Sequence, residues 1–318
     1  MKIVITGAAG YIGSYLCKEI VGQLPFAKIS AFDNLYYKQW EHVKSFLTHD
    51  RIKFYEEDIL DWSTNLTEAI ADADYVICLA AIVGAPACDK VPDLSTDLNY
   101  NWYKELLDKV DGKQKIIYPN TNSGYGTTPE GAICTEESPS NPLSLYGKLK
   151  QDTEDFLRKE YENVICFRLA TVFGLSGRPR LDLLVNNFVY RAVKDNHLDI
   201  FDGHFRRNFV SVRDVCRAFV FAMRPTNFGG MKGQVYNLGA DTLNSTKLEF
   251  AQKIQEITGC EVTEHSDKTD PDKRDYLVSS QKLYNLGFTP IDTTLDQRVR
   301  ELSVFCSNVT DTDGMFNY

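Results

Sequence analysis

The chain has 318 residues, of which 43% are hydrophobic and 25% are charged, and its formal net charge at pH 7 is −9. This composition is ordinary for a globular protein, and the length allows one large domain or two modest ones. An acidic balance without a basic run argues against nucleic acid and anionic membranes as partners, and no stretch is long and apolar enough to predict a membrane span.

Cysteine usage predicts a reducing compartment. The eight cysteines are scattered, with no C-x-x-C pair. This pattern favours reduced, buried thiols over a disulfide framework or a metal site. We therefore expect a cytoplasmic protein without a bound metal.

The first residues predict a strand, a glycine turn and a helix. Residues 2–6 are a short apolar run, Gly7, Gly10 and Gly13 follow, and residues 15–21 carry apolar side chains at helical spacing. Such glycines allow a sharp turn, a close approach of the backbone to a pyrophosphate and close packing of helix on strand. The spacing G-x-x-G-x-x-G taken alone is also compatible with an ordinary tight turn.

The second predicted strand, residues 29–33, ends in an acid. A carboxylate about twenty residues after the glycines can accept both hydroxyls of an adenosine ribose and repels a 2′-phosphate. Asp33 therefore favours NAD over NADP, and the alternative is an aspartate that merely caps a turn. Asp58, after a third predicted strand at 51–55, could meet the adenine amino group or lie in a solvated acidic loop.

Strands and helices continue to alternate as far as residue 169. Further strands are expected at 75–81, from 115–118 onward and at 164–169, and helices at 66–70, 97–110 and 145–161. This alternation predicts an α/β fold with a doubly wound parallel sheet of the Rossmann type, whose ligand lies at the carboxyl ends of the strands. The positions expected at those ends are Gly7, Asp33, Asp58, Ala81 and Thr121.

After Gly174 the pattern changes to a smaller, mixed α/β part. We expect residues 1–174 to form an NAD-binding domain and residues 175–318 to be mainly a substrate-binding domain, with some segments returning to the first. Helices are expected at 181–193, 214–223 and 248–258, and strands at 198–201 and 234–238. Loops are expected at 175–180 and at 202–212, and the second of these loops leads into another short strand.

Four local expectations concern this second part. The helix at 214–223 should be capped by Asp214 or a neighbour, and the helix at 248–258 should end at Gly259. Arg178 and Arg180 are expected in surface ion pairs. Residues 307–318 are polar with little pattern and are expected to fray.

Tyr146 and Lys150 are the candidate proton-transfer pair. Side chains four residues apart share one face of a helix. An ammonium beside a phenol favours the phenolate, which would lower the tyrosine pKa from ~10 and make Tyr146 a general base. A Y-x-x-x-K spacing alone is more often a surface pair, but here it follows a dinucleotide sheet and Thr121, whose hydroxyl could orient a reacting alcohol.

Several motifs together resemble one enzyme family. They are Thr6-Gly-Ala-Ala-Gly-Tyr-Ile-Gly13, Asp33-Asn34-Leu35, Asp58, Leu79-Ala-Ala81, residues 121–126 and Tyr146-x-x-x-Lys150. The chain is similar to the extended short-chain dehydrogenases/reductases, and more narrowly to the NAD-dependent nucleotide-sugar epimerase/dehydratase group.

This resemblance implies a tightly held NAD and a nucleotide-diphosphate sugar as substrate. Tyr146 would take a proton from a sugar hydroxyl while a hydride passes to the nicotinamide, usually from C4. Thr121 would bond that oxygen, and Lys150 would hold the nicotinamide ribose. The cofactor-binding residues so implied are Gly7, Gly10, Tyr11, Ile12, Gly13, Asp33, Asn34, Asp58, Ile59, Leu79, Ala80, Ala81, Asn99 and Lys150.

The substrate-binding residues implied by the resemblance extend into the second part of the chain. Arg207 begins a segment resembling the family's R-D-[FY]-[IV]-x-V-x-D, whose arginine binds the substrate diphosphate. Arg274 lies in a second segment, 273–276, which resembles the family's later segment with another arginine that binds the diphosphate or the ribose. Asn187 would lie near the phosphates, and Thr121, Asn122, Ser123 and Tyr146 would contact the sugar. The helices holding Asn99 and Tyr146 usually form a homodimer interface in this family.

Departures from the family pattern narrow the range of reactions that we expect the chain to catalyse. The 4,6-dehydratases have Asp-Glu after the catalytic Thr, and decarboxylating relatives have Glu, but here Asn122 and Ser123 follow Thr121. Cys78 and Thr171 replace a frequent His and Asn, which leaves the substrate open. We expect an epimerase, with a nucleotide-sugar 4-dehydrogenase or 4-keto reductase as the alternative. A non-catalytic NAD-binding regulator is a third reading, disfavoured because Thr121, Tyr146 and Lys150 are all present.

Overall fold

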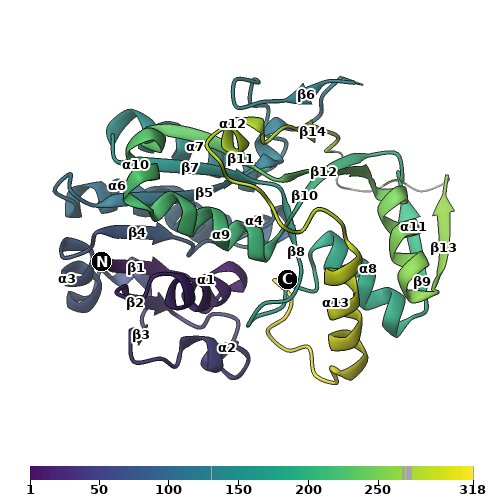
Figure 1. The fold of residues 1–318 in the computed structure, drawn as a ribbon, viewed down its shortest axis with the longest axis horizontal. Coiled ribbons are helices and arrows are strands. Elements are labelled where there is room, and N and C mark those ends of the chain that lie inside the picture. The colour runs from purple at the N-terminus through teal and green to yellow at the C-terminus, as the bar shows by residue number, and fades with distance from the viewer. Residues whose placement is uncertain (130, 267–268, 270–273, 318) are drawn as a thin grey trace.

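The centre of the fold is a seven-stranded parallel sheet, shown in Figure 1. The computed structural model describes residues 1–129, 131–266, 269 and 274–317. The strand order is β11-β7-β5-β4-β1-β2-β3, and every neighbouring pair is parallel. The strands are β1 (Lys2–Thr6), β2 (Lys28–Asp33), β3 (Ile52–Glu56), β4 (Tyr75–Cys78), β5 (Lys115–Thr121), β7 (Val164–Leu169) and β11 (Gln234–Leu238). The predicted doubly wound sheet is confirmed, and its carboxyl ends share one edge.

Helices cover both faces of this sheet, because its strands are apolar on both sides. Ile3 and Ile5 of β1 face one hydrophobic cluster and Val4 faces the other. On the first side lie α1 (Tyr11–Gln23), α2 (Trp40–Leu47), α9 (Val212–Met223) and α10 (Pro225–Met231). On the second lie α3 (Thr64–Ala71), α4 (Ala85–Lys90), α5 (Pro92–Thr96), a π-helical turn (Asp97–Asn101), α6 (Trp102–Lys109) and α7 (Leu145–Glu160).

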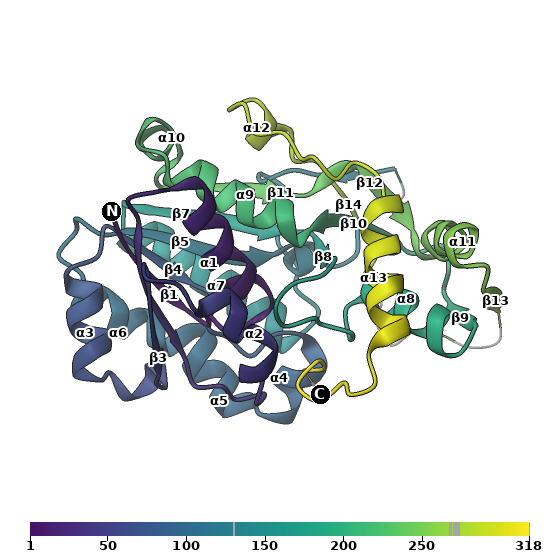
Figure 2. The same ribbon diagram turned by 60° about the horizontal axis from the view of Figure 1, so that its bottom comes forward.

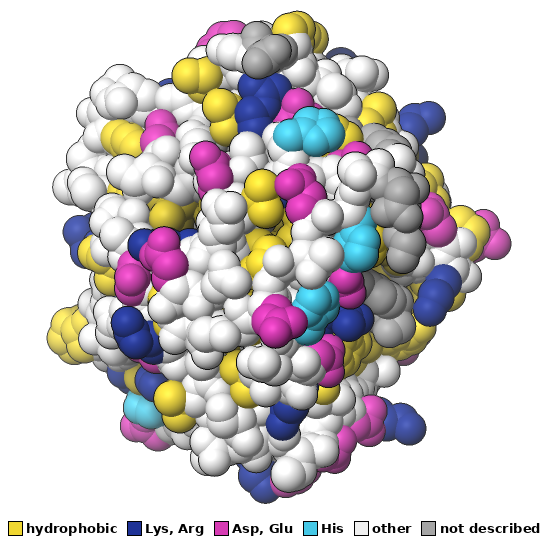
Figure 3. All heavy atoms as spheres, turned by 90° about the vertical axis from the view of Figure 1, so that its right-hand side faces the viewer, with side chains coloured by type: hydrophobic (Ala, Val, Ile, Leu, Met, Phe, Trp, Pro, Cys, Tyr) yellow, Lys and Arg dark blue, Asp and Glu magenta, His cyan; other side chains and the backbone are white. Residues whose placement is uncertain are grey.

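A smaller part lies beyond the carboxyl edge of the sheet. Its sheets are β12-β10-β8, β13-β9 and β14-β6. Figure 2 shows α8, α11 and α13 grouped at this end, where α8 contacts both α11 and α13. The strands are β6 (Ile133–Cys134), β8 (Thr171–Phe173), β9 (His197–Phe201), β10 (Arg206–Ser211), β12 (Ala240–Thr246), β13 (Glu261–His265) and β14 (Leu277–Val278), and the helices are α8 (Leu184–Lys194), α11 (Lys247–Thr258), α12 (Gln281–Tyr284) and α13 (Asp296–Asn308). In Figure 3, acidic, basic and hydrophobic side chains are interspersed over the outer face of this part.

The chain crosses between the two parts more than once. After β10 it returns to the large sheet, where α9 packs against α1 and β11 pairs with β7. It then leaves again through β12. Residues 175–318 therefore supply both a cover for the carboxyl edge and an outer strand of the central sheet. No helix among the described residues is long and apolar enough to cross a membrane.

The start of α9 and the C-terminal residues differ from the sequence-based expectation. Helix α9 begins at Val212, and its N-cap is Ser211, whose hydroxyl accepts from the Asp214 N–H at 3.1 Å. Residues 309–317 do not fray, since Met315 and Asn317 are buried; Tyr318 lies outside the described residues. The predicted end of α11 at Gly259 is confirmed, with a left-handed φ of 79°.

Candidate active site

The glycine turn after β1 is shaped by close backbone contacts. Gly7 has a φ of +69°, and a Cβ there would lie 2.5 Å from the backbone nitrogen of Ala80. A Cβ on Gly13 would lie 2.3 Å from the carbonyl oxygen of Gly7. No side chain caps the start of α1, and its first turn holds no acid. The helix start can therefore donate backbone N–H groups to a phosphate.

Two carboxylates lie at the carboxyl ends of β2 and β3, as predicted. Asp33 Oδ1 accepts from the Leu35 N–H (2.8 Å) and Gln39 Nε2 (3.1 Å), and Oδ2 accepts from the Ala9 N–H (3.0 Å). Burial raises the pKa of Asp33, while these hydrogen bonds and the charge of Arg178 oppose the rise. Asp58 accepts from the Leu60 N–H and from Asn34 Nδ2 at 2.8 Å, so the two strand ends are joined.

A single pocket joins most of the predicted cofactor residues. It is lined by Gly7, Gly10, Tyr11, Ile12, Gly13, Asp33, Asn34, Asp58, Ile59, Leu79, Ala80 and Ala81. Asn99 is fully buried outside this lining, where its amide donates to the Ile82 carbonyl (2.8 Å) and accepts from the Ile82 N–H (3.1 Å). Because Ile82 lines the pocket, Asn99 fixes the pocket wall.

Several lining residues were not predicted from the sequence. They are Tyr36, Tyr37, Gln39, Glu57, Ile82, Val83, Leu94, Leu98, Arg178, Arg180 and Asn317. Surface ion pairs were expected for the two arginines, but both are buried, and only Arg180 is paired, with Asp182. Asp182, two residues after Arg180, could have indicated the ion pair, but its presence in the sequence does not indicate that the pair is buried.

Thr121 and Ser123 form a hydroxyl pair at the end of β5. Thr121 Oγ1 donates to Ser123 Oγ (3.0 Å) and accepts from the Ser123 N–H, capping the short helix Asn122–Tyr125. Arg274 Nη1 donates to Ser123 Oγ, and Arg207 Nη1 donates to the carbonyl oxygen of Arg274. Residues far apart in sequence thus bring two arginines to one pair of hydroxyls; Lys273, next to Arg274, lies outside the described residues.

Helix α7 carries Tyr146 and Lys150 and is fixed to the sheet by a buried ion pair. Arg168 of β7 lies 2.6 Å from Glu154 of α7, and Asn120 of β5 also donates to that carboxylate at 2.6 Å. Lys150 is 3% exposed, and its Nζ lies 4.0 Å from the ring centroid of Tyr118. Neither Tyr146 nor Lys150 lines the pocket described above, and Thr121 does not line it either.

The charges around Tyr146 differ from the sequence-based expectation. Burial raises the pKa of the Tyr146 phenol, and the charges acting to lower it belong to Arg180 and Arg274. Lys150 was expected to supply that effect, but burial lowers its own pKa to about 7. Arg180 lines the pocket, and its charge also acts on Tyr146, the candidate proton-transfer residue.

Asn122, Asn186 and Asn187 differ in their contacts near the site. Asn122 Nδ2 donates to Asn208 Oδ1 (3.1 Å), and Asn122 Oδ1 is buried without a hydrogen-bond partner among the described residues. Asn187, expected near the phosphates, donates to the Leu181 carbonyl (2.9 Å) and does not line the pocket. Its neighbour Asn186 is fully buried and donates to the Arg180 carbonyl at 2.9 Å, so Asn186 helps to position Arg180.

The pocket fits a dinucleotide. The glycine cradle excludes side chains from the helix start, and Asp33 lies at the end of β2, where a ribose hydroxyl would meet its carboxylate. Within the described parts of the chain, no group of three or more His, Cys, Asp or Glu residues could hold a metal ion.

Comparisons with known proteins agree with this fit. Residues 3–239 match the NAD dependent epimerase/dehydratase family. The chain is 26% identical over 302 residues to the low-salt glycan biosynthesis protein Agl12 of Haloferax volcanii, covering 91% of this chain and 94% of that protein. It is also 26% identical over 306 residues to the dTDP-D-glucose 4,6-dehydratase of Mus musculus, covering 91% and 84%.

Solved structures show the same fold. UDP-glucuronic acid 4-epimerase from Bacillus cereus, in complex with UDP-glucuronic acid and NAD, has a TM-score of 0.84 and 26% identity, covering 96% of this chain and 99% of that one. A dTDP-glucose 4,6-dehydratase from Bacillus anthracis, in complex with NAD, has a TM-score of 0.81 and 24% identity, covering 96% of both chains. The chain belongs to the NAD-dependent epimerase/dehydratase family and is an enzyme whose cofactor is NAD.

Proposed function

We propose that this enzyme is a nucleotide-sugar epimerase that inverts a secondary alcohol, at C4 of the sugar, by transient oxidation. The observation that carries the proposal is the set of groups around Thr121 and Tyr146. Asn122 and Ser123 follow Thr121, so these two positions hold neither an acid nor a base. Eliminating water from the sugar needs an added acid and base, whereas oxidation and reduction at one carbon needs one proton-transfer residue.

Each residue of the proposed site has a separate task. Tyr146 takes the proton of the sugar hydroxyl and later returns it, and Thr121 orients that hydroxyl through its own. NAD, when bound, supplies the acceptor and donor of the hydride at the sugar carbon. Burial raises the Tyr146 pKa, and the charges of Arg180 and Arg274 offset part of that rise.

The substrate diphosphate has a matching pair of cations. Arg207 is 3% exposed, and Arg274 bonds to the hydroxyl of Ser123 beside Thr121. Guanidinium groups suit phosphate oxygens because they donate in a planar fork. We propose that these arginines hold the diphosphate while Asn122 and Ser123 contact the sugar. The unpartnered Oδ1 of Asn122 can accept from a sugar hydroxyl.

The proposal is tested by product identity. The NAD-loaded protein is incubated with UDP-, GDP-, CDP- and dTDP-sugars without added cofactor, and the sugars are examined by NMR. The expected result is a mixture of two epimers that differ at one carbon. A 4-keto-6-deoxy sugar would identify a dehydratase, and a keto sugar formed only with added NAD would identify a dehydrogenase. Retained NAD without turnover on any of these sugars would favour a binding regulator.

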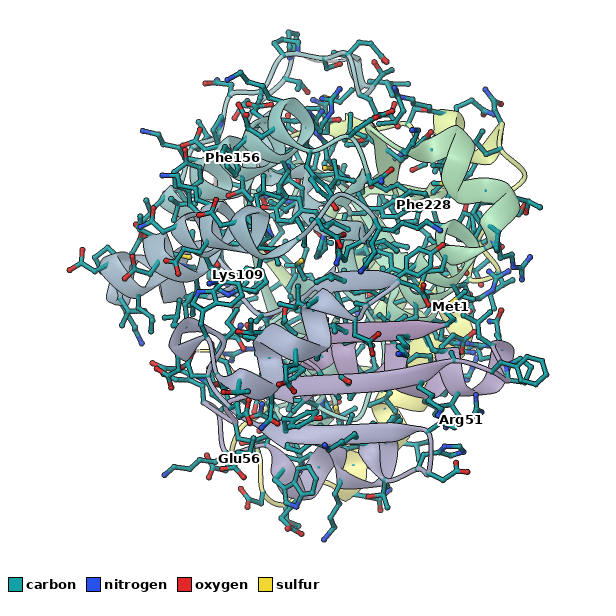
Figure 4. The ribbon with its side chains drawn as sticks, turned by 90° about the vertical axis from the view of Figure 1, so that its left-hand side faces the viewer. Met1, Arg51, Glu56, Lys109, Phe156 and Phe228 are labelled. Atoms are coloured by element: carbon teal, nitrogen blue, oxygen red, sulfur yellow. The ribbon has the colours of Figure 1, made fainter. Side chains whose placement is uncertain are left out.

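We also propose a homodimer in a reducing, cytoplasmic compartment. Phe156 of α7, labelled in Figure 4, is half-buried, and its ring centroid lies 6.3 Å from that of Tyr100 in the π-helical turn. These neighbouring aromatics give α7 and the π-helical turn a shared outer patch that a second copy could cover. All eight cysteines are free and buried. Light scattering after size-exclusion chromatography should give twice the 36.1 kDa chain mass, and a monomer would overturn the dimer.

A further inference from the structure

Residues 309–317, here called the strap, follow the end of α13 toward the C-terminus (Figure 2), and Asn317 near its end lines the cofactor pocket. Met315 is buried in a cluster with Leu181 and Cys306, and its carbonyl accepts from the Leu181 N–H at 2.9 Å. Asn317 lines the pocket, and its Nδ2 donates to the Val83 carbonyl at 3.2 Å. The strap thus ties the loop after β4 to the smaller part of the molecule.

The strap also closely approaches the loop after β2. Gly314 has a φ of +72°, and a Cβ there would lie 2.7 Å from the Tyr37 carbonyl oxygen. One residue earlier, the Asp313 carbonyl lies 3.0 Å from His42 Nε2 of α2. A backbone in this conformation and at this distance requires glycine, so the docking of the strap is built into its sequence.

Arg178 is held by the strap through three hydrogen bonds. Its Nε donates to the Gly314 carbonyl (2.7 Å), and its Nη2 donates to the Phe316 carbonyl (3.3 Å) and to Asn317 Oδ1 (2.9 Å). Its guanidinium lies 4.0 Å from the ring centroid of Tyr37. These contacts engage Nε and Nη2 and leave the N–H groups of Nη1 for a ligand in the pocket that Arg178 lines.

The charge of Arg178 is not balanced by an ion pair. Arg178 is 3% exposed, yet no carboxylate among the described residues forms a salt bridge with it, whereas neighbouring Arg180 is paired with Asp182. Burial and the charge of Arg180 lower the pKa of Arg178 to about 10, while Asp33 acts in the opposite sense. A buried cation in this state is stabilised by an anion that enters its site.

We propose that Arg178 binds the diphosphate of NAD, and that the strap holds Arg178 in place and so slows the departure of the cofactor. The diphosphate is the anionic group of NAD, and a guanidinium pairs with phosphate oxygens. The start of α1 and Arg178 then provide phosphate donors from two elements that lie over 160 residues apart in sequence. An enzyme that oxidises and then reduces one sugar on one cofactor benefits from such retention.

The test measures cofactor binding independently of turnover. Arg178→Gln removes the charge, and Asn317→Ala removes one bond to Arg178 and the bond to Val83 while preserving the charge. The matched control is Arg51→Gln, because Arg51 also donates to two backbone carbonyls, of Leu24 and Val21, but lies near Met1 at the opposite end of the sheet (Figure 4). NAD retained after dialysis, its dissociation constant and its release rate are measured for each protein.

Arg178→Gln should weaken NAD binding about ten- to hundredfold, as expected for the loss of a charged hydrogen bond. ADP-ribose, which carries the same diphosphate, should lose affinity by the same factor. Asn317→Ala should speed NAD release several-fold, and Arg51→Gln should behave as the wild type.

Three results would overturn the proposal. NAD affinity and release in Arg178→Gln could equal those of Arg51→Gln. A loss confined to NADP would place Arg178 at the 2′-position of the ribose instead of at the diphosphate. Unchanged NAD release in a folded Asn317→Ala protein would remove the role of the strap. None of these results depends on which sugar the enzyme uses.

Discussion

Burial of the Lys150 side chain lowers the stability of the cofactor-free protein at neutral pH. Its ammonium is buried against the Tyr118 ring, and burial lowers its pKa to about 7. Between about pH 7 and pH 10.5 the unfolded chain holds this proton and the folded chain does not. The contribution of Lys150 to stability therefore rises with pH through that window and is least favourable below pH 7.

Replacing Lys150 should make this dependence visible. Lys150→Met is expected to raise the free energy of unfolding of the NAD-free protein by about 1–3 kcal/mol at pH 7, because a buried polar group is removed. Urea denaturation of both proteins at pH 7 and pH 10 measures the difference. The gain should shrink between pH 7 and pH 10, because releasing the Lys150 proton on folding costs less free energy as the pH rises toward 10.5, and a gain of equal size at both pH values would contradict the assignment.

In the proposed mechanism Tyr146 acts on a proton, so its hydroxyl should be needed for turnover and dispensable for cofactor binding. Tyr146→Phe is expected to lower kcat by about 10²- to 10⁴-fold with NAD content unchanged. The matched control is Tyr103→Phe, because the Tyr103 hydroxyl is buried without a hydrogen-bond partner among the described residues. Initial rates on the identified sugar compare the two variants, and equal rates would remove Tyr146 from the reaction.

At the scale of single elements, α1 offers two glycines in different surroundings. A Cβ on Gly13 would meet the Gly7 carbonyl, whereas a Cβ on Gly22, in the same helix, would meet nothing within 4 Å. Gly13→Ala should therefore distort the phosphate cradle and abolish NAD retention. Gly22→Ala should keep NAD and stabilise the helix by about 0.5–1 kcal/mol. Calorimetric NAD titration and thermal unfolding of both variants test this, and unimpaired NAD binding by Gly13→Ala would contradict the cradle.

The elements of the central sheet could be predicted because their signals are local. Apolar runs such as residues 2–6 and 164–169 are strands, and the glycines and Asp33 fall at strand ends, where parallel topology gathers them. The spacing of Tyr146 and Lys150 likewise placed both on α7. These features depend on periodicity and topology, which a single sequence carries.

The strap and Arg178 could not be predicted, because their burial depends on distant partners. Residues 309–317 have no apolar periodicity, and they are held by Leu181, Val83 and His42 from three separate segments. The expected effect of Lys150 on the Tyr146 pKa failed for a similar reason. The sequence gives the spacing of the pair, but the depth of burial and the neighbouring arginines depend on the whole fold.

At the scale of the whole molecule, the repeated crossing of the chain brings pocket residues and the proposed substrate residues together. The pocket is built mainly by the sheet, while Arg178, Arg180 and Asn317 reach it from later segments. Arg207 and Arg274 reach Ser123 in the same way. In the proposed mechanism, the sugar would react with one bound NAD between these two parts of the chain.

The proposed epimerase mechanism requires that oxidation and reduction of the sugar both occur on one bound NAD. The most direct measurement follows absorbance at 340 nm after the NAD-loaded enzyme is mixed with its nucleotide sugar, without added cofactor, while the epimer is quantified in parallel. We predict that NADH absorbance settles at a constant level of at most one NADH per active site while the free sugar epimers reach equilibrium, and that all of the cofactor is recovered as NAD once the sugar is removed. Epimer formed at an equal rate by enzyme stripped of NAD, or NADH that accumulates until an external keto sugar is supplied, would contradict an internal redox cycle.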